Sequence, residues 1–256
     1  MGINGLMFLT VILGGVMFWG IAVRRFHDGM EMTTAGLGWI GSLLVLISFL
    51  ALVWIKPSDP QAFEKNLKWM QKRQKEIEDV LEKIPEINTT LGMDEMSIYQ
   101  LLDSGETHDF LKYAKTGKSM YAWHLLKLSW SIAPELSIVM VLGLLSGLIG
   151  TLIAISEMLA GRRMWRALAI CNAVMAGISF AFIISKVAFL DTLGTFENAR
   201  IRLIAALAEM EISSASWWML MGLFLVVLSG VMHYFLHDII EDDDLDTYEE
   251  RYSYHE

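Results

Sequence analysis

The sequence predicts an all-α, polytopic membrane protein with five transmembrane helices and a helical extramembrane domain between helices 2 and 3. Hydrophobic residues make up 54% of the 256-residue chain and charged residues 19%, whereas soluble domains carry about 45–50% and about 25%. The apolar residues gather in five long runs, and a run of about 20 residues crosses about 30 Å of hydrocarbon as a helix. Four prolines and many Leu, Met and Ala residues favour helices over a β-barrel.

The five apolar runs divide the chain into membrane and polar parts. They cover residues 6–23, 33–55, 136–158, 167–186 and 212–236. We therefore expect transmembrane helices 1 and 2 within residues 1–55, and helices 3 to 5 within residues 136–236. The first run is not expected to be a cleaved signal peptide, because no positive residue precedes it and no Ala-x-Ala-like site follows it.

Residues 56–135 are polar and predict a helical domain outside the membrane. Within them, residues 61–83 form an amphipathic pattern that ends before Pro85. The apolar positions recur at steps of three and four, which is typical of a helix with one buried face. They are Phe63, Leu67, Met70, Ile77, Val80 and Leu81. Shorter helices are expected near residues 93–102, 108–114 and 119–131.

The net charge of −9 is concentrated in an acidic C-terminal tail at residues 237–256, where nine acids stand beside Arg251 as the sole base. The remaining chain is nearly neutral, which excludes a nucleic-acid-binding protein. The tail is interpreted as a solvated terminus, as a dock for a basic partner, or as a loose site for divalent cations. It lacks the glycine and the spacing of an EF-hand loop.

The basic residues leave the orientation in the membrane open. Eleven lie in residues 56–135, and this number favours a cytoplasmic N-terminus and a cytoplasmic polar domain. Arg24–Arg25 and the arginines of the turn at 162–166 lie in short loops, which carry the most weight in the positive-inside rule and favour the opposite orientation. We expect the N-terminus inside, because six of the eleven lie within 20 positions of the second run.

Small residues recur at helix-packing spacing in the third and fourth runs. Gly143, Gly147 and Gly150 lie in the third run and Gly177 in the fourth. Such residues let two helix backbones approach closely in lipid, so we interpret them as helix-packing positions.

Hydroxyl and charged side chains interrupt the same two runs. Thr151, Ser179 and Ser185 are candidates to line a polar path for protons or ions. The alternative is that each hydroxyl bonds to a carbonyl one turn back in its own helix.

Three ionisable groups are candidates for charged gating. They are Glu157, Lys186 and Asp191. A charge at the bilayer centre costs about 2.5–3.5 kcal/mol. The alternative therefore places these groups at the membrane interfaces, in contact with water.

These segments resemble the MotA/TolQ/ExbB proton-channel family over about residues 121–201. Pro134 is followed by Gly-Leu-Leu at 143–145 and Gly-Leu-Ile-Gly-Thr at 147–151, similar to the proline and Gly-Leu-Leu-Gly-Thr-Val-x-Gly of that family. Residues 176–185 resemble its Gly-Ile-x-x-Ala-Leu-x-x-Thr, with Ser185 at the position of the Thr. The fifth run and the acidic tail have no counterpart in the family.

The resemblance implies a stator-like assembly. Members of the family form a homo-oligomer, a pentamer, around a single-span membrane partner that carries an Asp, and proton flow drives work on that partner. Thr151 and Ser185 would then face the proton path. The chain would be a subunit of a proton- or ion-driven motor or channel, placed in the bacterial inner (plasma) membrane.

Two histidines suggest a different class of site. His233 and His237 are four residues apart at the end of the fifth run, so one helix face presents both. His108 or His124 would complete a metal or haem site if the fold brought it near. Cys171 is the single cysteine, which excludes an internal disulfide.

No nucleotide loop, catalytic triad or zinc-protease motif is present, so the sequence predicts no enzyme and no cofactor. An oligomeric proton- or ion-driven motor or channel is the first function hypothesis. A structural or accessory subunit of a larger membrane complex, without transport activity, is the second. A metal- or haem-binding membrane protein is the third.

Overall fold

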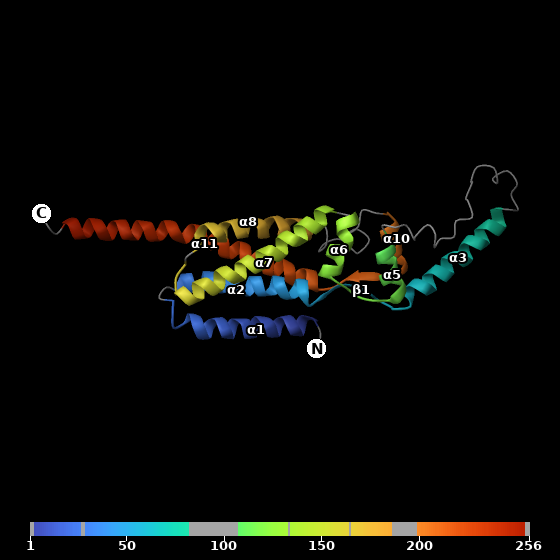
Figure 1. Cartoon of the computed structure of the whole chain (residues 1–256), viewed down its shortest axis with the longest axis horizontal. Coiled ribbons are helices and arrows are strands. Elements are labelled where there is room, and N and C mark those ends of the chain that lie inside the picture. Colours follow the sequence, from blue (N-terminus) through green and yellow to red (C-terminus); the bar gives the residue numbers. More distant parts are fainter. Residues whose placement is uncertain are drawn as a thin grey trace. The chain divides into compact units, whose positions relative to one another are not determined.

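The computed structural model describes residues 3–26, 29–81, 107–132, 134–163, 165–185 and 199–253 (Figure 1), and within these it has nine helices and three short strands. The chain divides into two compact units. Unit 1 contains Met1–Ala51, Val139–Ile183 and Trp217–Glu256, and unit 2 contains Leu52–Ile138 and Ile184–Ser216. Each unit is described by itself.

Unit 1 contains the membrane-type helices. They are α1 (Ile3–Ala22), α2 (Gly29–Leu50), α7 (Pro134–Ala160), α8 (Arg166–Ile183) and α11 (Ala215–Ser253). Within the described residues, five helical stretches are long and apolar enough to cross a membrane, namely α1, α2, Ser137–Ala160, α8 and Ala215–Phe235. The five predicted helices are therefore confirmed. Helix α11 continues past the apolar stretch through most of the acidic tail.

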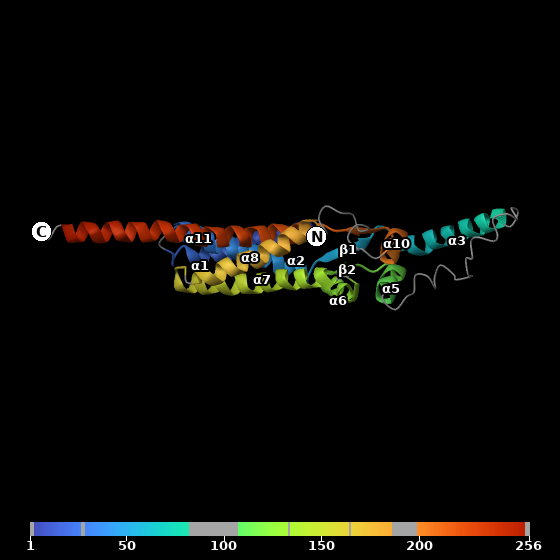
Figure 2. The same ribbon diagram turned by 90° about the horizontal axis from the view of Figure 1, so that it is seen from above.

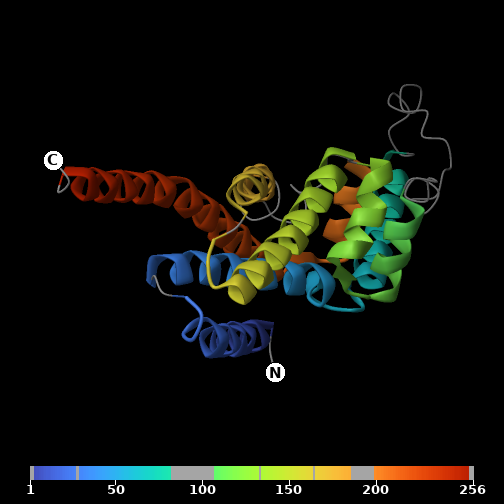
Figure 3. The same ribbon diagram turned by 60° about the vertical axis from the view of Figure 1, so that its left-hand side comes forward.

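Helix α2 lies at the centre of unit 1. The Trp39 indole N–H donates a hydrogen bond of 3.1 Å to the Gly14 carbonyl of α1, and Figure 3 shows α1 next to α2. On other sides, α2 packs through Gly41 against Gly222 of α11 and through Ser42 against Gly150 of α7. Figure 2 shows α8 beside α11, where Gly230 contacts Ala173.

The outer face of α1 carries large apolar side chains that no other described residue covers. They include Phe8, Val16, Met17 and Trp19, each more than 60% exposed. In water such a continuous apolar surface is unfavourable, whereas in a bilayer it faces hydrocarbon. The exposure is therefore consistent with an integral membrane protein.

Unit 2 contains a three-stranded antiparallel sheet of order β2-β1-β3, together with helices. Its strands are β1 (Val53–Pro57), β2 (Met120–Tyr121) and β3 (Met210–Ile212), and Ile55 pairs with Met120 on one side and Ile212 on the other. Its helices are α3 (Ala62–Leu81), α5 (His108–Thr116), α6 (Ala122–Ile132) and α10 (Ala199–Leu207). The expectation of an all-α fold is therefore incomplete, because it omits this sheet.

The core of unit 2 joins segments far apart in the sequence. Trp54 and Ile55 of β1 are buried, as are Phe63 of α3, Phe110 of α5 and Ile204 of α10. The predicted amphipathic helix at 61–83 matches α3. The expected helix near residues 93–102 lies outside the described residues. The sheet adds Ile184–Ser216 to the polar segment that the sequence analysis bounded at 56–135.

His124 of α6 gives unit 2 a pH-dependent stability. Burial of its ring, and then the Lys127 ammonium, lower the pKa of His124 from its ordinary 6.5. Below pH 6.5 the unfolded chain binds a proton that the folded chain does not, so the free energy of unfolding falls as the pH drops toward the lowered pKa. We expect an NMR titration of the ring to give a midpoint below 6.5. A midpoint at or above 6.5 would contradict the prediction.

Candidate functional site

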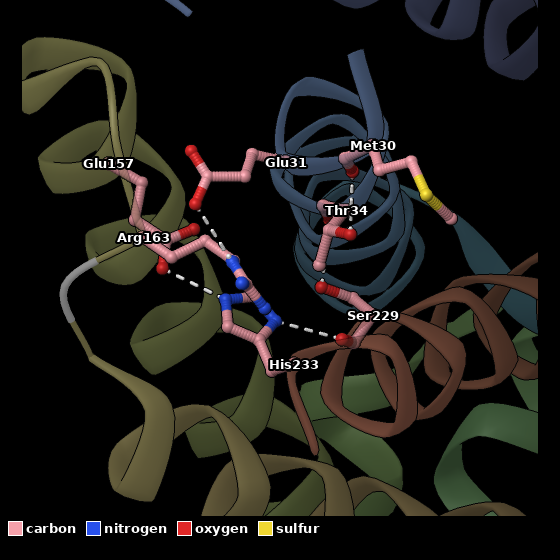
Figure 4. A network of polar contacts seen from close by, with 7 residues as sticks. All are labelled: Met30, Glu31, Thr34, Glu157, Arg163, Ser229 and His233. Carbon is pink, nitrogen blue, oxygen red and sulfur yellow. Dashed lines mark hydrogen bonds and ion pairs between the residues drawn. The ribbon is translucent and has the colours of Figure 1, made fainter. Parts of the chain in front are cut away.

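A carboxyl group and an imidazole meet inside unit 1. Glu157 of α7 and His233 of α11 are 0% and 2% exposed, and Glu157 Oε1 lies 2.9 Å from His233 Nε2 (Figure 4). Both residues lie in helices of the membrane-spanning type. Ionisable groups are rare in such helices and are paired where they occur, and their position there indicates a functional role.

The second ring nitrogen fixes the tautomer of His233. Nδ1 lies 2.8 Å from the Ser229 carbonyl oxygen, one turn back in α11. A carbonyl oxygen only accepts, so Nδ1 carries a hydrogen and donates it. The contact with Glu157 then holds one proton, which sits either on the carboxyl as Oε1–H···Nε2 or on the ring as Nε2–H···Oε1. Both arrangements are hydrogen-bonded and have no net charge.

Ser229 also connects the pair to α2. Its hydroxyl donates to the Thr34 carbonyl over 2.9 Å, and the Thr34 hydroxyl donates to the Met30 carbonyl over 2.8 Å. Figure 4 shows this series of contacts from His233 to Met30. The ring of His233 is thereby held between a carboxyl on α7 and a carbonyl of its own helix α11, and the hydroxyl of the same Ser229 ties that turn to α2.

A small cavity of about 20 Å³ lies beside the pair, lined by Glu157, His233, Asn172 and Gly150 among others. This volume is large enough for about one water molecule. Among the described residues, Glu157 Oε2 and Asn172 Oδ1 are buried without a hydrogen-bond partner. Buried acceptors are stabilised by a donor, and the cavity has room for a water molecule that would supply one.

An ion pair joins the residues just after α7 to the first turn of α2. Arg163, just after α7, places its Nε 3.1 Å from Glu31 Oε1 in the first turn of α2, and the two side chains are 11% and 18% exposed (Figure 4). The Arg25 guanidinium donates to the Leu159 carbonyl, one of the last in α7. These contacts tie together the ends of α1, α2 and α7 close in sequence to Glu157.

The predicted path residues occupy different settings. The Thr151 hydroxyl donates to the Gly147 carbonyl over 2.8 Å within α7, which is the alternative considered for a lone hydroxyl. The buried Ser179 hydroxyl donates to the Val139 carbonyl of α7 over 3.1 Å. Ser185 is exposed and belongs to unit 2. A path shared by Thr151 and Ser185 stays a prediction.

The other predicted site residues are the charged gating candidates and the two histidines, and only some of them are among the described residues. Lys186 and Asp191 lie outside the described residues, as does the side chain of His237. Within the described part of the chain, no group of three or more His, Cys, Asp or Glu side chains is arranged to hold a metal ion. His233 contacts Glu157 and Ser229 there.

The predicted packing glycines differ in how closely their neighbours approach. A Cβ on Gly150 would overlap Ser42 of α2, a Cβ on Gly147 would lie 3.0 Å from Val45, and one on Gly143 would lie 2.7 Å from the flexible end of Met219. Gly177 has room, since the nearest atom would be 3.8 Å away. Inside the membrane-type helices, Gly41 and Gly222 also bring two backbones close together, since a Cβ on either would lie 2.7 Å from the carbonyl oxygen of the other; the sequence analysis did not single out this pair.

Sequence reasoning also missed Asn172, Ser229 and Thr34. The sequence could have indicated Asn172, because an amide in the middle of an apolar run is costly to bury without a partner. Nothing in the sequence distinguishes Ser229 and Thr34, since hydroxyls in apolar runs usually bond within their own helix. No protein-family model, curated protein or solved structure matches the chain.

The sequence analysis predicts that Thr151 lines a path for protons or ions, and Thr151→Val tests this prediction. The hydroxyl bonds within its own helix, and valine has nearly the same shape, so we expect any proton flux measured in liposomes to stay at least half as large in the variant as in the unsubstituted chain. Ser179→Ala provides a comparison at a buried hydroxyl. A flux that disappears in Thr151→Val would instead place Thr151 in the path.

Proposed function

We propose that this chain is an integral membrane protein that moves protons, and that Glu157 and His233 carry the proton. The observation that supports the proposal is the buried contact of 2.9 Å between Glu157 Oε1 and His233 Nε2. The cavity beside the pair is lined by α2, α7, α8 and α11, which are four of the five described helices apolar enough to cross a membrane. A stable core does not need such a pair, because apolar residues of similar volume are often as stable or more stable.

The chemistry of transfer follows from the tautomer. At rest the pair holds one shared proton and is neutral. A second proton added at Glu157 Oε2 yields a protonated carboxyl beside an imidazolium, and loss of a proton from either group restores the neutral pair. The His233 Nδ1–H stays bound to the Ser229 carbonyl throughout, so the exchanged proton is confined to the Glu157 side of the ring.

Coupling to a partner is a separate part of the proposal. The resemblance to the MotA/TolQ/ExbB family supports a ring of identical copies around a single-span partner in a bacterial plasma membrane. Native mass spectrometry of the detergent-solubilised chain tests this part. Five copies support it, whereas a monomer contradicts the stator-like assembly and leaves the Glu157–His233 proposal intact.

Reconstitution tests proton movement directly. The purified full chain is placed in liposomes with a trapped pH-sensitive dye, and a potassium diffusion potential drives protons inward. We expect faster internal acidification than in protein-free liposomes. Internal acidification no faster than in protein-free liposomes, at either polarity of the potential, would contradict the proposal. It would favour a structural or accessory subunit without transport.

A further inference from the structure

Unit 2 contains a second cavity, unrelated to the Glu157–His233 pair. It has a volume of about 310 Å³ and is lined by α5, the start of α6 and the segment between them. Three of the residues that line it are lysines, namely Lys112, Lys118 and Lys127. Asp109 is the acidic residue among the described lining residues. A cavity of this size accommodates a small organic molecule.

The local fold brings the lysines together. Helix α5 ends at Thr116, and Gly117 takes the left-handed conformation with φ 59°. The N–H of Gly117 then donates to the Ala114 carbonyl, and the N–H of Lys118 to the Tyr113 carbonyl, both over 3.2 Å. This closure is typical of a helix C-terminus. It reverses the chain so that Lys118 returns toward the cavity that Lys112 lines.

The cavity has excess positive charge. Lys127 Nζ lies 3.7 Å from Asp109 Oδ2, but these side chains are 80% and 58% exposed, so the pair is weak. Within the described part of the chain, Lys112 and Lys118 have no carboxylate within ion-pair distance. Among the described residues, two ammonium groups therefore stand beside one cavity without a counter-charge.

His124 adds a neutral donor to the same wall. Its Nδ1 accepts the Tyr121 backbone N–H over 3.1 Å, so the neutral ring carries its hydrogen on Nε2. Burial lowers the pKa of His124, which keeps the ring neutral at pH 7. Tyr113 packs edge-on against the ring at 5.0 Å between centroids and lines the cavity with it. The lining thus offers ammonium, imidazole N–H and phenol donors.

We propose that this cavity binds the phosphoryl group of a phosphate monoester. Two ammonium groups without a counter-charge match a dianion, whereas a carboxylate would neutralise only one of them. Lysine is a common phosphate ligand and acts as a point charge. The volume exceeds that of a phosphate ion, so an organic part of the ligand enters as well. The phosphoryl group belongs either to a soluble ester or to an anionic lipid headgroup.

Two binding measurements distinguish these sources. Calorimetry of the detergent-solubilised full chain uses glycerol phosphate as the soluble probe. Thermal unfolding in phosphatidylcholine nanodiscs, with and without phosphatidic acid, tests the lipid. We expect at least one probe to bind, and the double variant Lys112→Gln/Lys118→Gln to weaken that binding at least tenfold.

The control for Lys112→Gln/Lys118→Gln is a double variant that removes two positive charges elsewhere in unit 2. Lys65→Gln/Lys68→Gln removes two exposed lysines of α3 that do not line the cavity, and we expect binding within twofold of the wild type. Two outcomes would overturn the proposal. One is that neither probe binds at millimolar concentration. The other is that both double variants weaken binding equally, which would indicate a general charge effect.

Discussion

Replacing Glu157 with Gln is expected to reduce proton flux in liposomes about 100-fold, the lower end of what a positioned acid–base group contributes. Glutamine has the shape of glutamate, and its amide NH2 can donate to His233 Nε2, so the contact between α7 and α11 is kept. What the variant loses is the carboxyl proton. Glu157 is fully buried, and the cavity beside it has room for about one water molecule, which is too little for a continuous chain of water to replace the carboxyl.

The matched control is Glu211→Gln, which makes the same substitution at an exposed position in β3 of unit 2. We expect wild-type flux in this variant and a similar thermal unfolding temperature in both. A Glu157→Gln protein that is folded and transports protons at the wild-type rate would exclude Glu157 as a carrier. His233→Ala is less informative, because it leaves Glu157 buried without its partner, which costs about 3–5 kcal/mol.

The five membrane-type helices were predictable from the sequence, whereas the sheet was not. An apolar run of about 20 residues has one stable form in a bilayer, since only a helix satisfies its own backbone groups there. The strands have five, two and three residues, too few for an alternating pattern. Val53–Ile55 of β1 and Ile212 of β3 also adjoin apolar runs, and the predicted helices 2 and 5 absorbed them.

The candidate site was predicted in parts but not as a pair. Glu157 was singled out as a charge near a membrane-type helix, and His233 was singled out with His237 as a metal ligand. They are 76 positions apart, and their contact depends on the register between α7 and α11. Register is set by side-chain packing along the whole helix pair, which periodicity within one helix does not reveal.

Another close contact of α11 is its crossing with α2, where two glycines face each other. A Cβ on Gly41 would lie 2.7 Å from the Gly222 carbonyl oxygen, and a Cβ on Gly222 would lie 2.7 Å from the Gly41 carbonyl oxygen and 2.8 Å from the Val45 backbone nitrogen. These are backbone atoms, so they cannot rotate away as a side chain would. Close backbone approach through small residues is the usual means of packing helices in lipid.

Gly222→Val is therefore expected to destabilise the packing of α11 strongly. Inserting carbon atoms into a well-packed interior costs about 1–3 kcal/mol, and a backbone obstacle places this variant at or above the upper end. We expect a clear decrease in the thermal unfolding temperature in detergent. Gly20→Val in α1 is the control, because nothing lies within 4 Å of a Cβ there.

The same variant links packing to the site. Moving α11 away from α2 stretches the 2.9 Å hydrogen bond from the Ser229 hydroxyl to the Thr34 carbonyl. Because Ser229 also bonds to the His233 ring, His233 shifts too. We therefore expect the folded fraction of Gly222→Val to transport protons more slowly than Gly20→Val at equal protein density. Equal unfolding temperatures for the two variants would show that the Gly41–Gly222 contact does not hold α2 and α11 in register.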